Sequence, residues 1–136
     1  HRGSRFVKDS KPTPLPLDTF YLTGNWSQND EGISTSDTSA TLSFRAKGSG
    51  VGLVTRSLSK IIEKGKVVVQ TEAGPLYDVY AGSNLMFNDE KSFLDVREGA
   101  FYKIAAGLPE ETRDLTLTFP NANRVPLALY SLRFSN

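Results

Sequence analysis

Alternation of apolar and polar residues is the clearest pattern along this chain. In "ATLSFRA" (residues 40–46), Leu42 and Phe44 alternate with polar neighbours, the period of two that buries one face of a β-strand. Similar runs recur as far as the C-terminus, separated by turns rich in glycine, proline or polar residues, as in all-β domains. The predicted strands span residues 38–46, 51–56, 66–72, 92–98, 101–106, 113–120 and 127–134.

Helical periodicity is weak by comparison. No segment keeps apolar residues at helical spacing for three turns, although "SLSKIIEKG" (57–65) is compatible with one short turn. About eight strands with connections of mixed length predict an antiparallel β-sandwich of jelly-roll type. Long polar loops are expected at residues 27–37, 57–65 and 73–91. The predicted core residues are Leu42, Phe44, Leu53, Val68, Leu115, Leu117 and Phe119.

The 136 residues suit one domain. Residues 1–4, "HRGS", resemble the remnant of an affinity tag. Alternate prolines within residues 5–17 favour an extended linker, so the single β-sandwich domain is expected over residues 18–136. We also expect the chain to be a segment of a longer protein.

Charge and residue usage exclude several classes of function. The 16 basic and 15 acidic residues leave a net charge of +1, which gives no sign of a nucleic-acid partner. No apolar run approaches the roughly 20 residues that span a bilayer, so no membrane insertion is expected. The chain has no cysteine, and its one histidine is His1 in the tag-like start. Disulfides, thiol nucleophiles and a histidine-dependent triad are therefore excluded.

A hydrolase that uses two carboxylates needs no histidine. Most carboxylates in a small domain are solvated surface charges, so this is the least favoured hypothesis; we predict no catalytic residue and no enzyme activity for the domain. The loops "SQNDEG" and "FNDEKS" offer oxygen ligands for calcium but lack a specific calcium-loop spacing, so no cofactor is predicted and metal binding stays open. The candidate carboxylates are Asp30, Glu31, Asp78, Asp89, Glu90 and Asp95.

Aromatic residues in or beside the polar loops are the more informative set. A pyranose ring stacks its apolar face on an aromatic side chain, and its hydroxyls need polar partners at the edge. Trp26 follows a strand end and is interpreted mainly as a lid on the core, with a ligand platform as the alternative. The candidate ligand-binding residues are Tyr77, Asp78, Tyr80, Asn84, Phe87 and Trp26.

Four segments also resemble a known family in order along the chain. They are "LPLDTFYLTGNW" (15–26), "ATLSFRAKGSGVGLV" (40–54), "VREGAFYKIAAG" (96–107) and "RDLTLTFPNANRVPLALYSLRF" (113–134). The chain is similar to the C-terminal, carbohydrate-binding-module-like jelly roll of DipZ-type cytochrome c biogenesis proteins, which resemble fusions of a CcdA-like membrane domain, a thioredoxin-like domain and this module. In that family the tryptophan of "GNW" belongs to the shared framework.

The resemblance implies an extracytoplasmic domain, in the periplasm or at the cell surface, attached to a membrane-anchored or exported thiol-disulfide oxidoreductase. Its implied partners are a carbohydrate or cell-wall glycan and the thioredoxin-like domain of the same parent chain. Two hypotheses follow: a non-catalytic carbohydrate-binding module, or a structural or protein-interaction domain that positions a redox partner and binds no sugar. Fold similarity alone carries the glycan expectation.

Overall fold

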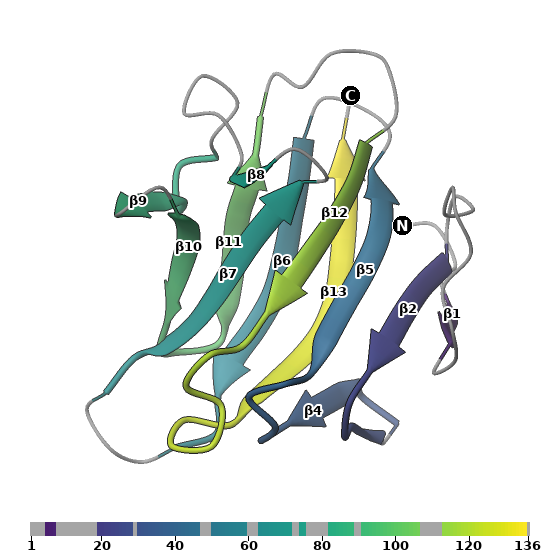
Figure 1. Ribbon diagram of the computed structural model, residues 1–136, viewed down its shortest axis with the longest axis vertical. Helices are drawn as coiled ribbons and strands as arrows, with labels where there is room; N and C mark the ends of the chain where they lie inside the picture. Colours follow the sequence, from purple (N-terminus) through teal and green to yellow (C-terminus); the bar gives the residue numbers. More distant parts are fainter. Residues whose placement is uncertain are drawn as a thin grey trace.

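The computed structural model describes residues 5–7, 19–28, 30–46, 50–59, 63–71, 74–75, 82–88, 91–106 and 113–135. These residues form thirteen β-strands and no helix (Figure 1). The strands are β1 (Arg5–Val7), β2 (Thr19–Thr23), β3 (Ser27–Gln28), β4 (Ile33–Thr35), β5 (Thr41–Ala46), β6 (Gly50–Ser57), β7 (Gly65–Thr71), β8 (Gly74–Pro75), β9 (Met86–Asn88), β10 (Lys91–Val96), β11 (Ala100–Ala105), β12 (Arg113–Thr118) and β13 (Leu127–Ser135).

Two sheets form the layers of a sandwich. The larger sheet has eight strands in the order β1-β2-β5-β12-β7-β10-β9, with β8 paired to β7. The smaller sheet has five strands in the order β11-β6-β13-β4-β3. All pairs are antiparallel except β1 with β2. In Figure 1, β7 and β12 of the larger sheet lie in front of β6 and β11 of the smaller one. The predicted antiparallel β-sandwich is confirmed.

The core fills the space between the inner faces of the two sheets. Phe20 and Phe44 meet edge to face at a centroid distance of 5.9 Å, and Phe134 from the smaller sheet lies 5.9 Å from Phe44. Edge-to-face and tilted ring pairs add to the stabilisation from burying apolar area. Every predicted core residue is buried: Leu42, Phe44, Leu53, Val68, Leu115, Leu117 and Phe119.

Val68 is nevertheless buried on the other face of its strand. Its neighbours Val67 and Val69 are fully buried in the core, and successive side chains of a strand point to opposite faces. Val68 therefore lies on the outer face of the larger sheet, opposite Phe93 in the register of β7 and β10.

Two predicted loops contain strands. Residues 27–37 include β3 and β4, and residues 73–91 include β8 and β9; all four strands have two or three residues, too short for an alternating pattern to reveal. The first residues of the expected linker form β1, which pairs in parallel with β2. Residues 8–18, and residues 60–62 of the expected helical turn, lie outside the described residues.

Candidate functional site

A pocket of about 330 Å³ opens at one end of the sandwich. Both sheets contribute to it, through the segment after β2, the strand β4, and the residues that follow β6 and precede β13. This volume is at the small end of the range of about 300–1,000 Å³ typical of ligand sites. The lining residues are Asn25, Trp26, Ser27, Ser34, Thr35, Ser36, Leu58 and Pro126.

A glycine allows the sharp turn that brings the chain to this pocket. Gly24 has φ of +84°, a conformation that L side chains rarely adopt, and a Cβ there would lie 2.7 Å from Cα of Ala40. The backbone can therefore turn sharply at the end of β2 and pass close to the neighbouring loop. This turn at the glycine of "GNW" places Asn25 and Trp26 at the pocket.

Hydrogen bonds fix the backbone within each of two walls of the pocket. The backbone N–H of Asn25 donates to Oδ2 of Asp37 at 2.9 Å, and Oγ1 of Thr35 donates to the carbonyl oxygen of Asn25 at 2.8 Å. On the opposite wall, the backbone N–H of Leu58 donates to the carbonyl oxygen of Pro126 at 2.8 Å. These bonds fix the backbone that carries the lining residues.

Asp37 is the acidic centre of this network. The Oγ of Ser39 donates to its Oδ1 at 2.7 Å, and the backbone N–H groups of Asn25 and Ser39 donate to the same carboxylate. Hydrogen bonds to the charged form, the side-chain bond from Ser39 first, lower the pKa of Asp37 below its ordinary value of 3.8. Asp37 is therefore ionised at neutral pH and acts as an anchor for the loop.

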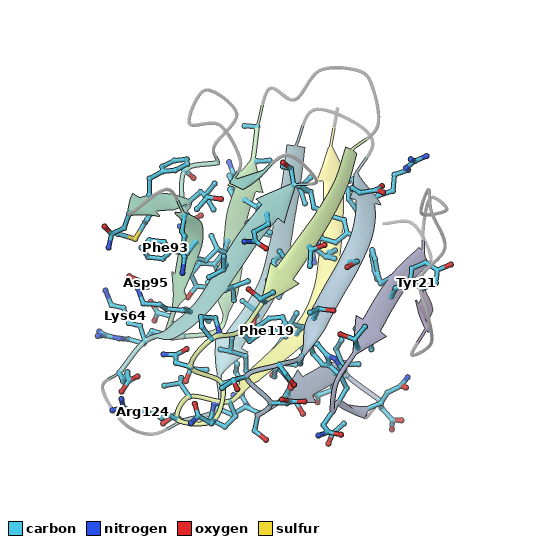
Figure 2. All side chains as sticks on the ribbon, viewed as in Figure 1. Tyr21, Lys64, Phe93, Asp95, Phe119 and Arg124 are labelled. Atoms are coloured by element: carbon cyan, nitrogen blue, oxygen red, sulfur yellow. The ribbon has the colours of Figure 1, made fainter. Side chains whose placement is uncertain are left out.

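Trp26 joins the core to the pocket. Its Nε1–H donates to the carbonyl oxygen of Thr23 at 2.8 Å, and its ring stands perpendicular to Phe119 at a centroid distance of 5.4 Å. The indole is partly buried against the core, and it also lines the pocket. Phe119 is fully buried in the lower half of the sandwich (Figure 2). The contacts agree with the interpretation of Trp26 as a core lid, and they also give the pocket a rigid aromatic wall.

Two other candidate ligand residues, Asn84 and Phe87, do not line this pocket. Asn84 lies at the β11 edge, where its Oδ1 accepts a hydrogen bond from the backbone N–H of Lys103 at 2.8 Å. Phe87 is 45% exposed on β9, the edge strand of the larger sheet. Tyr77, Asp78 and Tyr80 lie outside the described residues, so their role stays a prediction.

The three described candidate carboxylates are not gathered at one site. Asp30 and Glu31 are exposed in the turn between β3 and β4, whereas Asp95 on β10 lies 3.8 Å from Nζ of Lys66. The remaining three candidates, Asp78, Asp89 and Glu90, lie outside the described residues. Among the residues that are described, no group of three or more acidic, histidine or cysteine side chains is placed to hold a metal ion.

Several lining residues were missed by the sequence analysis. The hydroxyl-rich run "STSDTS" (34–39) is typical of a polar loop, and nothing in its pattern indicates that it lines a pocket. Leu58 and Pro126 are far apart in sequence and reach the pocket because β6 and β13 are neighbours in the smaller sheet. Only the strand order brings them to Trp26.

A known protein family matches nearly the whole chain. The sequence model of the family described as thioredoxin-like C-terminal domain matches residues 4–134 of this chain. The chain belongs to this family. No curated protein matches the sequence of this thioredoxin-like C-terminal domain significantly. In the described part of the domain, no helix is long and apolar enough to cross a membrane.

Solved structures show the same fold. A family two carbohydrate esterase from Clostridium thermocellum, in complex with cellohexaose, superposes with a TM-score of 0.64 at 13% identity, covering 85% of this domain. The family two carbohydrate esterase from Cellvibrio japonicus gives 0.64 at 11% identity and 83% coverage. The thioredoxin-like C-terminal domain corresponds to only 30% and 29% of those chains. The similarity establishes a β-sandwich fold shared with part of these esterases.

Proposed function

We propose that this thioredoxin-like C-terminal domain is a non-catalytic carbohydrate-binding module, located outside the cytoplasm in an exported bacterial protein of DipZ type. The observation that carries the proposal is the pocket beside Trp26, where a fixed indole meets a hydroxyl-rich wall. Aromatic faces and hydroxyl groups together are the surfaces that recognise a pyranose ring.

The lining groups divide according to this chemistry. Trp26, Leu58 and Pro126 offer apolar surface to the face of a sugar ring. Ser27, Ser34 and Ser36 bring hydroxyls that both donate and accept hydrogen bonds. None of the lining residues in the described structure carries a charged side chain, so the pocket suits a neutral glycan.

The test is calorimetric titration of the domain with cellohexaose and a panel of neutral oligosaccharides. Trp26→Ala should weaken binding of a panel member about 5- to 150-fold, since a stacked aromatic contributes roughly 1–3 kcal/mol at a small contact site. Phe87→Ala is the matched control, because this exposed aromatic belongs to the distant β9 edge and should leave affinity unchanged.

Other binding results for the two variants would place the site elsewhere or remove the proposal. Loss of binding in Phe87→Ala with normal binding in Trp26→Ala would move it to the β9 edge. Absence of binding by every neutral glycan at millimolar concentration would remove the proposal. Melting curves of both variants keep loss of fold separate from loss of ligand.

The family match favours a second candidate, a domain that positions the thioredoxin-like domain of its parent chain and binds no sugar. Its test is disulfide reduction by the full-length parent protein before and after deletion of this module. A large loss of rate in the deletion, unchanged by Trp26→Ala, would support this scaffold function.

A further inference from the structure

The outer face of the smaller sheet carries an aromatic ring between two cations. On β11, buried Tyr102 and Ile104 alternate with exposed Phe101 and Lys103, so the latter two point away from the core. Leu132 of β13 is buried, and its neighbour Arg133 is exposed on the outer face. The strands β11, β6 and β13 stand side by side in the rear layer of Figure 1.

Gly52 makes room for the ring at the middle of this face. In the sheet register Gly52 of β6 lies between Lys103 of β11 and Arg133 of β13. A Cβ at Gly52 would collide with Cζ of Phe101, so the tip of the ring occupies the space where a side chain would be. Phe101 remains 43% exposed, seated on backbone and open to solvent.

Among the described residues, the cations that flank this ring have no acidic partners. The guanidinium carbon of Arg133 lies 5.9 Å from the centroid of Phe101, within the range of a cation–π contact. Lys103 lies two strand spacings from Arg133, about 9.5 Å across the sheet. Strands β3, β4, β6, β11 and β13 contain no aspartate or glutamate. Within the described part of the chain, neither cation forms an ion pair.

We propose that Phe101, Lys103 and Arg133 form a second binding site, which takes an acidic glycan such as a polyuronate. The exposed ring of Phe101 stacks on the apolar face of one sugar. The two cations pair with the carboxylates of other uronate units of the same glycan. Arginine and lysine bind carboxylates by charge-assisted hydrogen bonds, and the open face of a sheet leaves room for an extended glycan chain. This site lies apart from the Trp26 pocket and does not depend on the function proposed there.

Other anionic partners fit this surface less well. A specific protein interface buries about 800 Å² on each partner around an apolar centre, whereas the apolar part here is Phe101 with the half-buried Val54 beside it. Nucleic-acid binding rests on many phosphate contacts, and this face adds only Arg56 to the two cations in the described strands. One ring and two separated cations match a short stretch of acidic glycan.

The test uses the intact domain and an oligogalacturonate of six residues, titrated by calorimetry at low salt. The methyl-esterified oligomer, which lacks the charges, should bind at least about tenfold more weakly. Phe101→Leu, which keeps an apolar side chain on Gly52, and Arg133→Gln should each weaken binding of the acidic oligomer about 5- to 20-fold. A sulfated oligosaccharide of equal length distinguishes carboxylate from sulfate as the favoured anion.

Two controls separate this site from general charge attraction and from the Trp26 pocket. Arg45→Gln removes a cation from the larger sheet and should not change the affinity; a loss equal to that of Arg133→Gln would mean general charge attraction and overturn the proposal. Trp26→Ala should also leave the acidic oligomer bound. The proposal is equally overturned if the acidic oligomer does not bind at 10 mM, or if poly-glutamate binds as tightly and its affinity is insensitive to Phe101→Leu.

Discussion

The outer faces of the two sheets differ in whether their cations lie beside carboxylates. On the larger sheet, two cations have carboxylate partners: Nε of Arg45 lies 3.1 Å from Oδ1 of Asp114, and Nζ of Lys66 lies 3.8 Å from Oδ1 of Asp95. The strands of the smaller sheet hold three cations and no carboxylate. The chain as a whole is nearly neutral, so the imbalance is a property of one face.

Two phenylalanines on the outer faces, Phe93 and Phe101, also differ in exposure. On the larger sheet Phe93 is only 8% exposed, and Nζ of Lys66 lies 4.1 Å from the centroid of its ring; Figure 2 shows Phe93 and Asp95 together on β10. On the smaller sheet Phe101 is left 43% exposed. Around Phe93 the charges are paired and the ring is covered, so this region is complete without a ligand, whereas the ring and cations around Phe101 are exposed and suited to binding one.

The sharpest test of this difference is the stability of aromatic truncations. Phe44→Ala removes a fully buried ring and should lower the free energy of unfolding by about 3–5 kcal/mol. Phe101→Ala removes a ring that is nearly half exposed and should cost about 1 kcal/mol or less. Urea unfolding of both variants measures the two values, and similar losses would show that Phe101 is a structural residue.

Trp26 should fall between these two rings. Trp26→Ala loses the perpendicular contact with Phe119 and the hydrogen bond to Thr23, and we expect a loss of about 1–3 kcal/mol because the indole is only partly buried. Trp26→Phe retains a ring and should cost about 1 kcal/mol for the missing hydrogen bond. If Trp26→Ala melts like the unmutated domain, its function is that of a ligand platform alone.

The fold could be predicted from the sequence wherever one face of a strand alternates cleanly. Leu42, Phe44, Leu115 and Leu117 show a period of two, and all are buried as expected. The run of valines at 67–69 has no such period, so the outer position of Val68 could be decided only by the register of β7 with β10. Strands of two or three residues give no pattern at all.

The candidate sites depended on contacts that sequence does not encode locally. The sequence alone shows that Trp26 is an aromatic residue beside a loop. Its pocket also includes Leu58 and Pro126, which are brought close by the pairing of β6 with β13. Likewise, Gly52 falls within the predicted strand at residues 51–56, but its role beneath Phe101 follows from the register of β6 with β11. Long-range pairing thus determined both sites.

The next prediction tests whether the charge difference between the faces affects stability. Breaking the Arg45–Asp114 pair by Arg45→Gln should cost about 0.2–1 kcal/mol, the range measured for surface ion pairs. Arg133→Gln removes a cation that has no carboxylate partner in the described structure and should be neutral within about 0.5 kcal/mol. Thermal melts at low and high salt measure both, and a salt-sensitive loss in Arg133→Gln would reveal an acidic partner for that residue.

The smallest effect concerns the anchor beneath the Trp26 pocket. Hydrogen bonds lower the pKa of Asp37 in the folded state, so the unfolded state takes up a proton first as the pH falls. The stabilising effect of Asp37 is therefore fully present above its ordinary pKa of 3.8 and is lost as the pH falls through the lowered folded value. Asp37→Asn should be less stable than the unmutated domain at neutral pH, and the difference should vanish in strong acid, where both side chains are neutral. Urea unfolding of the two proteins between about pH 2.5 and pH 7 measures this convergence. A difference that stays constant across that range would mean that the hydrogen-bond geometry of Asp37, and not its charge, holds Asn25 and the adjacent Trp26 in place.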